Sequence, residues 1–157
     1  MKFPIYLAFV AQVMVLVSSK TSVGTCPKVS NVKNFNADAY VGRWYEYRRD
    51  SDNIFELWGE CVTATYGILS NGNVSVKNRL WLWYLFFSYY DITGEAKCNP
   101  TGSEGSCYVN FAPGEKDMTK ESNYEILDTD YYNYAIVYNC VQNGPNKSDT
   151  MWILTRA

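Results

Sequence analysis

The chain has 157 residues, with 14 Lys and Arg against 16 Asp and Glu, so its formal net charge is only -2. This length suits one domain, and the small charge leaves no electrostatic footprint for nucleic acid. Histidine is absent and the five cysteines include no CxxC pair, so the sequence predicts neither a metal site nor a common type of catalytic centre. We therefore expect a protein that is not an enzyme.

The first 19 residues are typical of a cleaved secretory signal: Lys2 precedes the apolar run 3–17, and small residues follow. We predict a signal peptide over 1–19, with cleavage as late as Gly24, and one folded domain over 20–157. The apolar run is shorter than the ~20 residues of a spanning helix, so a membrane anchor is the weaker alternative.

Export would place the chain outside the cell, in an oxidising compartment where cysteines form disulfides. The two sequons that begin at Asn73 and Asn146 then become expected glycosylation sites.

Aromatic residues make up 17% of the chain, which favours strands. Residues 35–42 have room for at most one helical turn before the first strand. Turn-forming clusters lie at 70–73, 99–102, 113–114 and 143–145, so successive strands should run antiparallel. Strands are expected at 43–49, 61–69, 73–81, 86–97, 106–112, 122–128, 133–142 and 150–156.

Several of these strands are apolar at alternate positions without being strongly polar between them, as from Val62 to Ile68. This pattern indicates two buried faces. We predict an all-β fold, an eight-stranded antiparallel up-and-down β-barrel, whose interior has room for one small ligand. An immunoglobulin-type sandwich is the alternative, but its Cys, Trp, Cys spacing is missing.

Residues 80–90 contain no charge, Gly or Pro. One interpretation is two buried strands that meet at a tight bend. The other is an aromatic lip at the barrel mouth, through which Trp81 to Tyr90 contact the ligand, a lipoprotein or a membrane.

Three short motifs resemble those of the lipocalin family. Gly42 and Trp44 follow the predicted helical turn, Thr129, Asp130 and Tyr131 come before the seventh strand, and Arg156 ends the last. Within the family, the Cys-Pro pair at 26–27 and the strands 61–66 and 92–96 are similar to apolipoprotein D, Lazarillo and the insect bilin-binding proteins. The resemblance implies a structural role for the six motif residues, with Trp44 closing the barrel floor under Arg156.

The resemblance also implies a secreted carrier of a small hydrophobic ligand such as a lipid, retinoid, sterol or fatty acid. The alternative is a pigment-binding coloration protein that holds a bilin such as biliverdin; no other cofactor is required. An amine-sequestering or defence protein is a third class, for which Glu46 is the candidate inward carboxylate. Combined with strand alternation, the barrel predicts ligand contacts from Tyr66, Val76, Asn78, Val109, Phe111, Val137 and Trp152, with Tyr66 and Asn78 as the polar groups.

The resemblance implies a disulfide between Cys26 and Cys140. Cys98 and Cys107 flank a turn-rich loop, so we expect a local bridge between them. Cys61 is left over: its partner in the family lies after the last strand, together with a packing helix, whereas this sequence stops at Ala157. We therefore expect a fragment that lacks the C-terminal helix, or else a pairing of Cys61 with Cys98 or Cys107.

Overall fold

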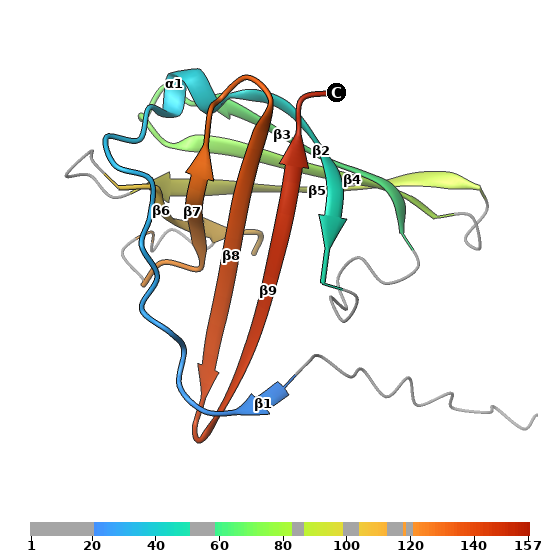
Figure 1. Cartoon of the computed structure of the whole chain (residues 1–157). Coiled ribbons are helices and arrows are strands. Elements are labelled where there is room, and N and C mark those ends of the chain that lie inside the picture. The colour runs from blue at the N-terminus through green and yellow to red at the C-terminus, as the bar shows by residue number, and fades with distance from the viewer. Residues whose placement is uncertain (1–20, 51–58, 83–86, 99–103, 113–117, 119–120) are drawn as a thin grey trace, which may run out of the picture.

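Nine strands and one short helix form the part of the chain that the structure describes (Figure 1). This computed structural model describes residues 21–50, 59–82, 87–98, 104–112, 118 and 121–157. The predicted signal peptide and the predicted turns at 99–102 and 113–114 lie outside these residues. The elements are β1 (Thr21–Val23), α1 (Ala37–Tyr40), β2 (Gly42–Arg49), β3 (Glu60–Ile68), β4 (Val74–Leu82), β5 (Ser88–Cys98), β6 (Ser106–Asn110), β7 (Tyr124–Thr129), β8 (Tyr134–Asn143) and β9 (Asn146–Thr155).

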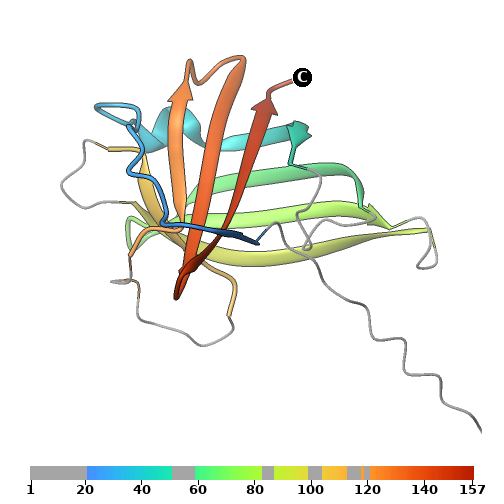
Figure 2. The same cartoon turned by 60° about the horizontal axis from the view of Figure 1, so that its bottom comes forward.

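Strands β2 to β9 close into a barrel. Each pairs antiparallel with the next in the sequence, and β9 pairs with both β8 and β2. The walls formed by β2 to β5 and by β7 to β9 cross at a steep angle (Figures 1 and 2). The predicted eight-stranded up-and-down barrel is therefore confirmed, and so is the single helical turn, which Asn36 caps by accepting a hydrogen bond from the Ala39 N–H.

Two features of the strands differ from the prediction. Strand β1 was missed because three residues are too short to show alternation; it pairs with β9 outside the closed ring. Strand β9 begins at Asn146, four residues before its predicted start. The reason is the two-residue connection of Gly144 and Pro145, in which Gly144 has a φ of +59°, so the polar stretch after it already pairs with β8.

One end of the barrel is closed by Trp44. Its side chain is fully buried, and its indole N–H donates to the Tyr40 carbonyl at 2.8 Å. The Arg156 guanidinium lies 3.7 Å from the centre of the Trp44 ring. It also donates to the carbonyls of Ala39, Tyr40, Arg43 and Tyr131 at 3.1 to 3.3 Å.

The entry to β2 passes close to this guanidinium. Gly42 has a φ of +98°, and a Cβ there would lie 3.1 Å from Arg156 Nη1. Only glycine combines this conformation with this approach at low cost. The first and last motifs therefore meet at this end of the barrel, with Arg156 against the Trp44 ring.

The third motif forms the turn from β7 to β8. The Asp130 carboxylate accepts hydrogen bonds from the N–H groups of Tyr132, Asn133 and Tyr134 and from the Asn133 side chain, which hold the pKa of Asp130 well below its usual range. The Thr129 hydroxyl donates to the Tyr134 carbonyl at 2.6 Å. Tyr131, which follows Asp130, accepts a hydrogen bond from Arg156 with its carbonyl. This turn is therefore connected to the end of the barrel that Trp44 closes, the barrel floor.

The protein has two disulfides, one on the outside of the barrel and one within its wall. Cys26 joins Cys140, which fixes the N-terminal arm against β8, and Cys98 joins Cys107 across β5 and β6. Both predicted bridges are confirmed. Cys61 is a free, exposed thiol on β3, so the alternative pairing with Cys98 or Cys107 is wrong.

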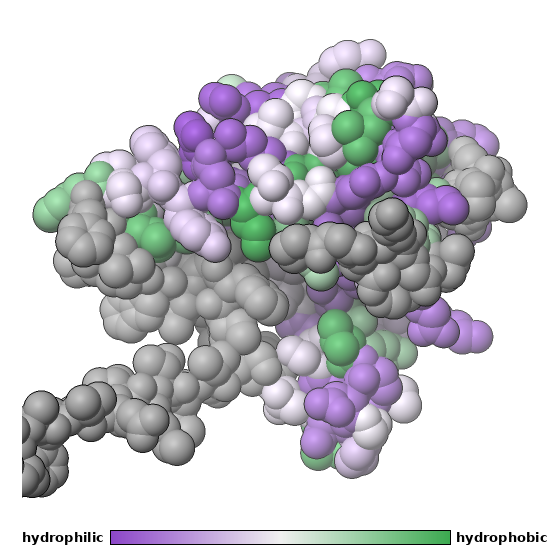
Figure 3. All heavy atoms as spheres, turned by 180° about the vertical axis from the view of Figure 1, so that it is seen from behind, coloured by the Kyte–Doolittle hydropathy of each residue, from purple (hydrophilic) through white to green (hydrophobic). Residues whose placement is uncertain are grey.

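The described residues of the aromatic stretch 80–90 are partly buried, as two strands that meet at a bend would be, and partly exposed, as an aromatic lip would be. Leu80 and Leu82 of β4 are buried, whereas Phe87, Tyr89 and Tyr90 are more than half exposed; residues 83–86 lie outside the described part. The view from behind shows hydrophobic and hydrophilic residues interspersed (Figure 3). Among the described residues, no helix has the length and hydropathy needed to cross a membrane.

We expect Arg156→Ala to lower the free energy of unfolding by about 2 to 3 kcal/mol, because it removes a cation–π contact and leaves several backbone acceptors without their charged donor. Urea denaturation measures this. Arg48→Ala is the matched control: Arg48 is an exposed arginine on β2, so the change should cost less than about 0.5 kcal/mol. Equal stability of the two variants would show that the Arg156 contacts do not hold the floor.

Candidate ligand site in the barrel interior

The barrel interior is mainly apolar because alternate residues of its strands turn inward. Its buried core includes three of the predicted ligand residues, Tyr66, Val76 and Val137. Three more are partly buried against this core: Val109, Phe111 and Trp152. The seventh, Asn78, lies opposite Ala64 of β3 and Ile92 of β5.

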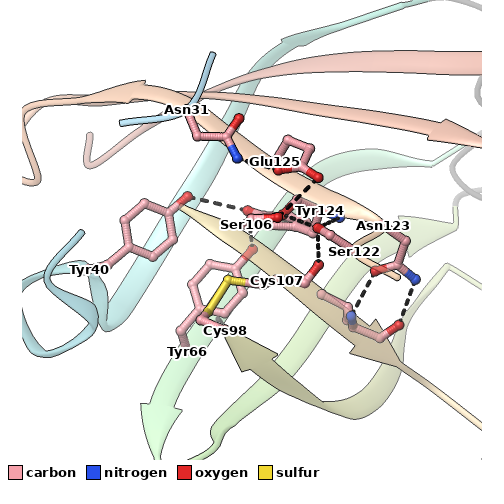
Figure 4. Close-up of a disulfide and its surroundings, with 11 residues drawn as sticks. Asn31, Tyr40, Tyr66, Cys98, Ser106, Cys107, Ser122, Asn123, Tyr124 and Glu125 are labelled. Carbon is pink, nitrogen blue, oxygen red and sulfur yellow. Dashed lines mark hydrogen bonds between the residues drawn. A yellow bond between two sulfur atoms is a disulfide. The ribbon is translucent and has the colours of Figure 1, made fainter. Parts of the chain in front are cut away.

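Three tyrosine hydroxyls meet near the closed end (Figure 4). Tyr124 lies between the other two, with O···O distances of 2.9 Å to Tyr66 and 3.3 Å to Tyr40. Burial raises the pKa values of Tyr40 and Tyr124 well above the ordinary value for tyrosine. Tyr66 raises both further, and Tyr40 also raises that of Tyr124, whereas the hydrogen bond from Tyr124 and the charge of Arg156 partly offset the rise in the pKa of Tyr40. Tyr40 and Tyr124 are therefore neutral over the physiological range. Sequence reasoning missed Tyr40 and Tyr124, although Tyr124 alternates with buried Ile126 in the predicted strand 122–128.

A small cavity lies beside the three tyrosines, lined also by Val109, Ile126 and the Cys98–Cys107 disulfide. The space open to the centre of a water molecule is about 20 Å³, enough for one or two waters. Two predicted ligand residues, Tyr66 and Val109, line it. Since a lipid does not fit in this volume, a carried molecule has to lie nearer the mouth, the end where β2–β3, β4–β5 and β6–β7 are connected, or has to displace these side chains.

The wall beside the tyrosines contains a short seam between β6 and β7, which pair at only two positions. The Asn123 side chain extends this ladder. Its Oδ1 accepts from the Val109 N–H at 2.7 Å and its Nδ2 donates to the Val109 carbonyl at 2.9 Å (Figure 4). An amide side chain thus takes the place of a backbone partner where the strands separate.

Charged side chains also enter the barrel interior. Glu46 follows Trp44 on the inward face of β2, opposite buried Leu154, and its side chain is 8% exposed. A bulge after Glu46 places Arg49 opposite Trp152, and Arg49 Nη1 donates to Glu46 Oε1. The sequence identified Glu46 but not its partner, because a bulge reverses the alternation on which that prediction depends.

Three inward oxygens have no hydrogen-bond partner within the described structure. They are Glu46 Oε2, Asn78 Oδ1 and Asn139 Oδ1. Buried polar atoms are normally paired, so such an atom calls for an explanation. The two predicted polar groups therefore differ: Tyr66 is bonded to another side chain, whereas Asn78 offers a free oxygen.

The comparisons with known proteins match these motifs and this topology. A family profile described as a lipocalin-like domain covers residues 35–157. The chain belongs to the lipocalin family. The solved structure of insecticyanin from the tobacco hornworm Manduca sexta superposes on this lipocalin with a TM-score of 0.73 at 27% identity, over 89% of this chain and 73% of the other.

Curated relatives come from the predicted subgroup, which is thereby confirmed. The Lazarillo protein of Schistocerca americana is 34% identical over 89% of this chain and 64% of its own length. Apolipoprotein D of Mus musculus is 34% identical over 85% of this chain and 67% of its own. The bilin-binding protein of Pieris brassicae is 31% identical over 97% and 78%. This lipocalin thus spans about two thirds of the length of the first two.

The tyrosine cluster predicts a steep loss of stability in alkali. Below pH ~10 the phenols are protonated in both states and their contribution is complete; above it, they ionise in the unfolded chain but not in the folded one. Each of Tyr40 and Tyr124 should then lower the free energy of unfolding by about 1.4 kcal/mol per pH unit.

Urea unfolding between about pH 9.5 and 11, with the Cys61 thiol alkylated, measures this slope. We expect Tyr124→Phe to reduce the slope by about 1.4 kcal/mol per unit, and Tyr132→Phe, at an exposed position, to leave it unchanged. Identical slopes for both variants would mean that Tyr124 ionises as freely in the folded protein as in the unfolded one.

Proposed function

We propose that this lipocalin carries one small hydrophobic molecule inside its barrel. The observation that carries the proposal is the apolar interior, closed at one end by Trp44 and Arg156. Burial of apolar ligand surface stabilises such a complex by roughly 25 cal/mol per Å². Membership of a family whose barrels bind small hydrophobic ligands supports the same function.

Two ligand classes remain in this proposal. A lipid, retinoid, sterol or fatty acid is the first, supported by the likeness to apolipoprotein D. A bilin such as biliverdin is the second, supported by the relative named bilin-binding protein. Colour distinguishes them: protein from its natural source absorbs red light if it holds a bilin, and is colourless if it holds a lipid.

The interior favours carriage over the other functions considered. An amine-binding protein would need an uncompensated inward carboxylate, but Arg49 neutralises Glu46. Catalysis is also disfavoured, since the chain has no histidine and the lipocalin family is generally one of carriers without enzymatic activity. We therefore propose a binding protein and not an enzyme.

We also propose that the protein is secreted and glycosylated. The apolar leader and the two disulfides support export. Of the two sequons, Asn73 lies in the turn before β4, where its side chain donates to Glu95, and Asn146 begins β9 beside the tight turn. Both therefore lie at the start of a strand, next to a turn.

The exposed aromatic residues Phe87, Tyr89 and Tyr90 support a further contact, with a lipoprotein or membrane, at the barrel mouth. In this proposal the stretch Trp81 to Tyr90 faces the donor or acceptor of the carried molecule. The cation–π contact of Arg79 with Tyr89 orients one of its rings.

The carrier function is tested by titrating all-trans-retinol into the purified protein and following tryptophan fluorescence. Saturable 1:1 quenching is expected, because Trp152 adjoins the interior core. Ala64→Phe adds an aromatic ring inside the barrel and should weaken binding at least tenfold. Thr65→Phe, on the outward face of the same strand, is the matched control and should bind normally. Equal binding by both variants would place the ligand outside the barrel.

A further inference from the structure

We propose that the carried molecule has an uncharged polar group with an O–H or N–H donor, and that Glu46 accepts the hydrogen bond from this donor. The inference rests on the proposed carrier function and specifies the chemistry of its ligand. Within the first ligand class it favours sterols and retinoid alcohols, and it excludes fatty acids and other ligands whose only polar group is a carboxylate or another pure acceptor.

Glu46 lies inside the barrel with one carboxylate oxygen unpaired in the described part of the molecule. Its side chain is more than nine-tenths buried, and it shares the inward face of β2 with Trp44. One carboxylate oxygen, Oε1, accepts from Arg49, while Oε2 has no partner in the described part of the molecule. A carboxylate is acceptor-only, so the group that completes this site has to be a donor.

The charges of Glu46 and Arg49 limit the charge that the ligand can carry. Arg49 lies on the same strand as Glu46 and pairs with it, and the Arg49 side chain is itself only 21% exposed. Because Arg49 offsets the charge of Glu46, a cationic ligand gains less attraction than it would from a lone carboxylate, and an anionic ligand meets an oxygen that repels it. A neutral donor is the group that can pair with Oε2 without bringing an uncompensated charge into the barrel.

The amides of Asn78 and Asn139 support this interpretation. Asn78 faces inward on β4 between Val76 and Leu80, and Asn139 follows Val137 on the inward face of β8. The Oδ1 atom of each is buried without a partner in the described structure. With Glu46 on β2, unpaired oxygens lie on three strands of the same apolar interior. A ligand with donors would satisfy oxygens that the folded chain leaves unpaired.

A ligand series with one carbon skeleton tests the proposal. All-trans-retinol has a hydroxyl donor, its methyl ether has the same oxygen without the donor, and all-trans-retinoic acid is an anion. For the unmodified protein, we expect retinol to bind about tenfold more tightly than the ether, and retinoic acid to bind more weakly than retinol.

Two variants connect the preference to Glu46. Glu46→Gln keeps an acceptor for Arg49 but replaces Oε2 by an NH2 donor, so it should weaken retinol binding about tenfold and should not weaken ether binding. Glu46→Leu combined with Arg49→Leu removes both charges of the pair; it should bind retinol and the ether equally. Glu60→Gln changes an exposed carboxyl on β3 and is the control, with normal preference. Circular dichroism verifies the fold of each variant.

The outcomes separate this inference from the proposed function. If all three ligands bind equally to the unmodified protein, or if the leucine double variant keeps the preference for retinol, the carrier function stands and the role of Glu46 is overturned. If none of the three binds, carriage of retinoid-like lipids falls and the inference falls with it.

Discussion

The contact of Arg156 with Trp44 is the constraint on which the barrel depends. Arg156 follows the last strand and Trp44 lies in the first strand of the closed ring, so their contact joins the two ends of the barrel sequence. The same guanidinium donates to carbonyls of α1, of β2 and of the turn between β7 and β8. One side chain thereby fixes three segments around a buried indole and seals one end of the barrel.

The interior above this floor has two kinds of surface. Near the closed end, the three tyrosine hydroxyls satisfy one another, so this region is packed and neutral. On β2, the bulge turns Arg49 toward Glu46 and leaves one carboxylate oxygen unpaired. The paired hydroxyls of the floor do not lower the free energy of unfolding, whereas an unpaired buried oxygen does. Ligand pockets commonly contain a few polar groups that fix the orientation of the ligand, and in the proposed complex Glu46 is such a group.

Much of the fold could be predicted because its determinants are local or periodic. Gly42, Trp44 and Arg156 belong to short motifs, and the alternation of apolar residues correctly predicted that Val76 and Val137 point inward. The prediction failed where a feature depends on non-local geometry: the inward Arg49 requires a bulge, and the tyrosine cluster joins three separate segments. Strand β1 exists only because β9 offers it an edge. The proposed need for a donor on the ligand could not be predicted, because it rests on which inward atoms remain unpaired in the folded chain.

The central claim is that the barrel holds one small hydrophobic molecule. Native mass spectrometry of the protein purified from its source tests this most directly, because it weighs whatever stays bound. The account predicts a complex heavier than the protein alone by one small molecule, which dissociates on collisional activation and contains a hydroxyl or N–H group. A spectrum that shows only the ligand-free protein would contradict it.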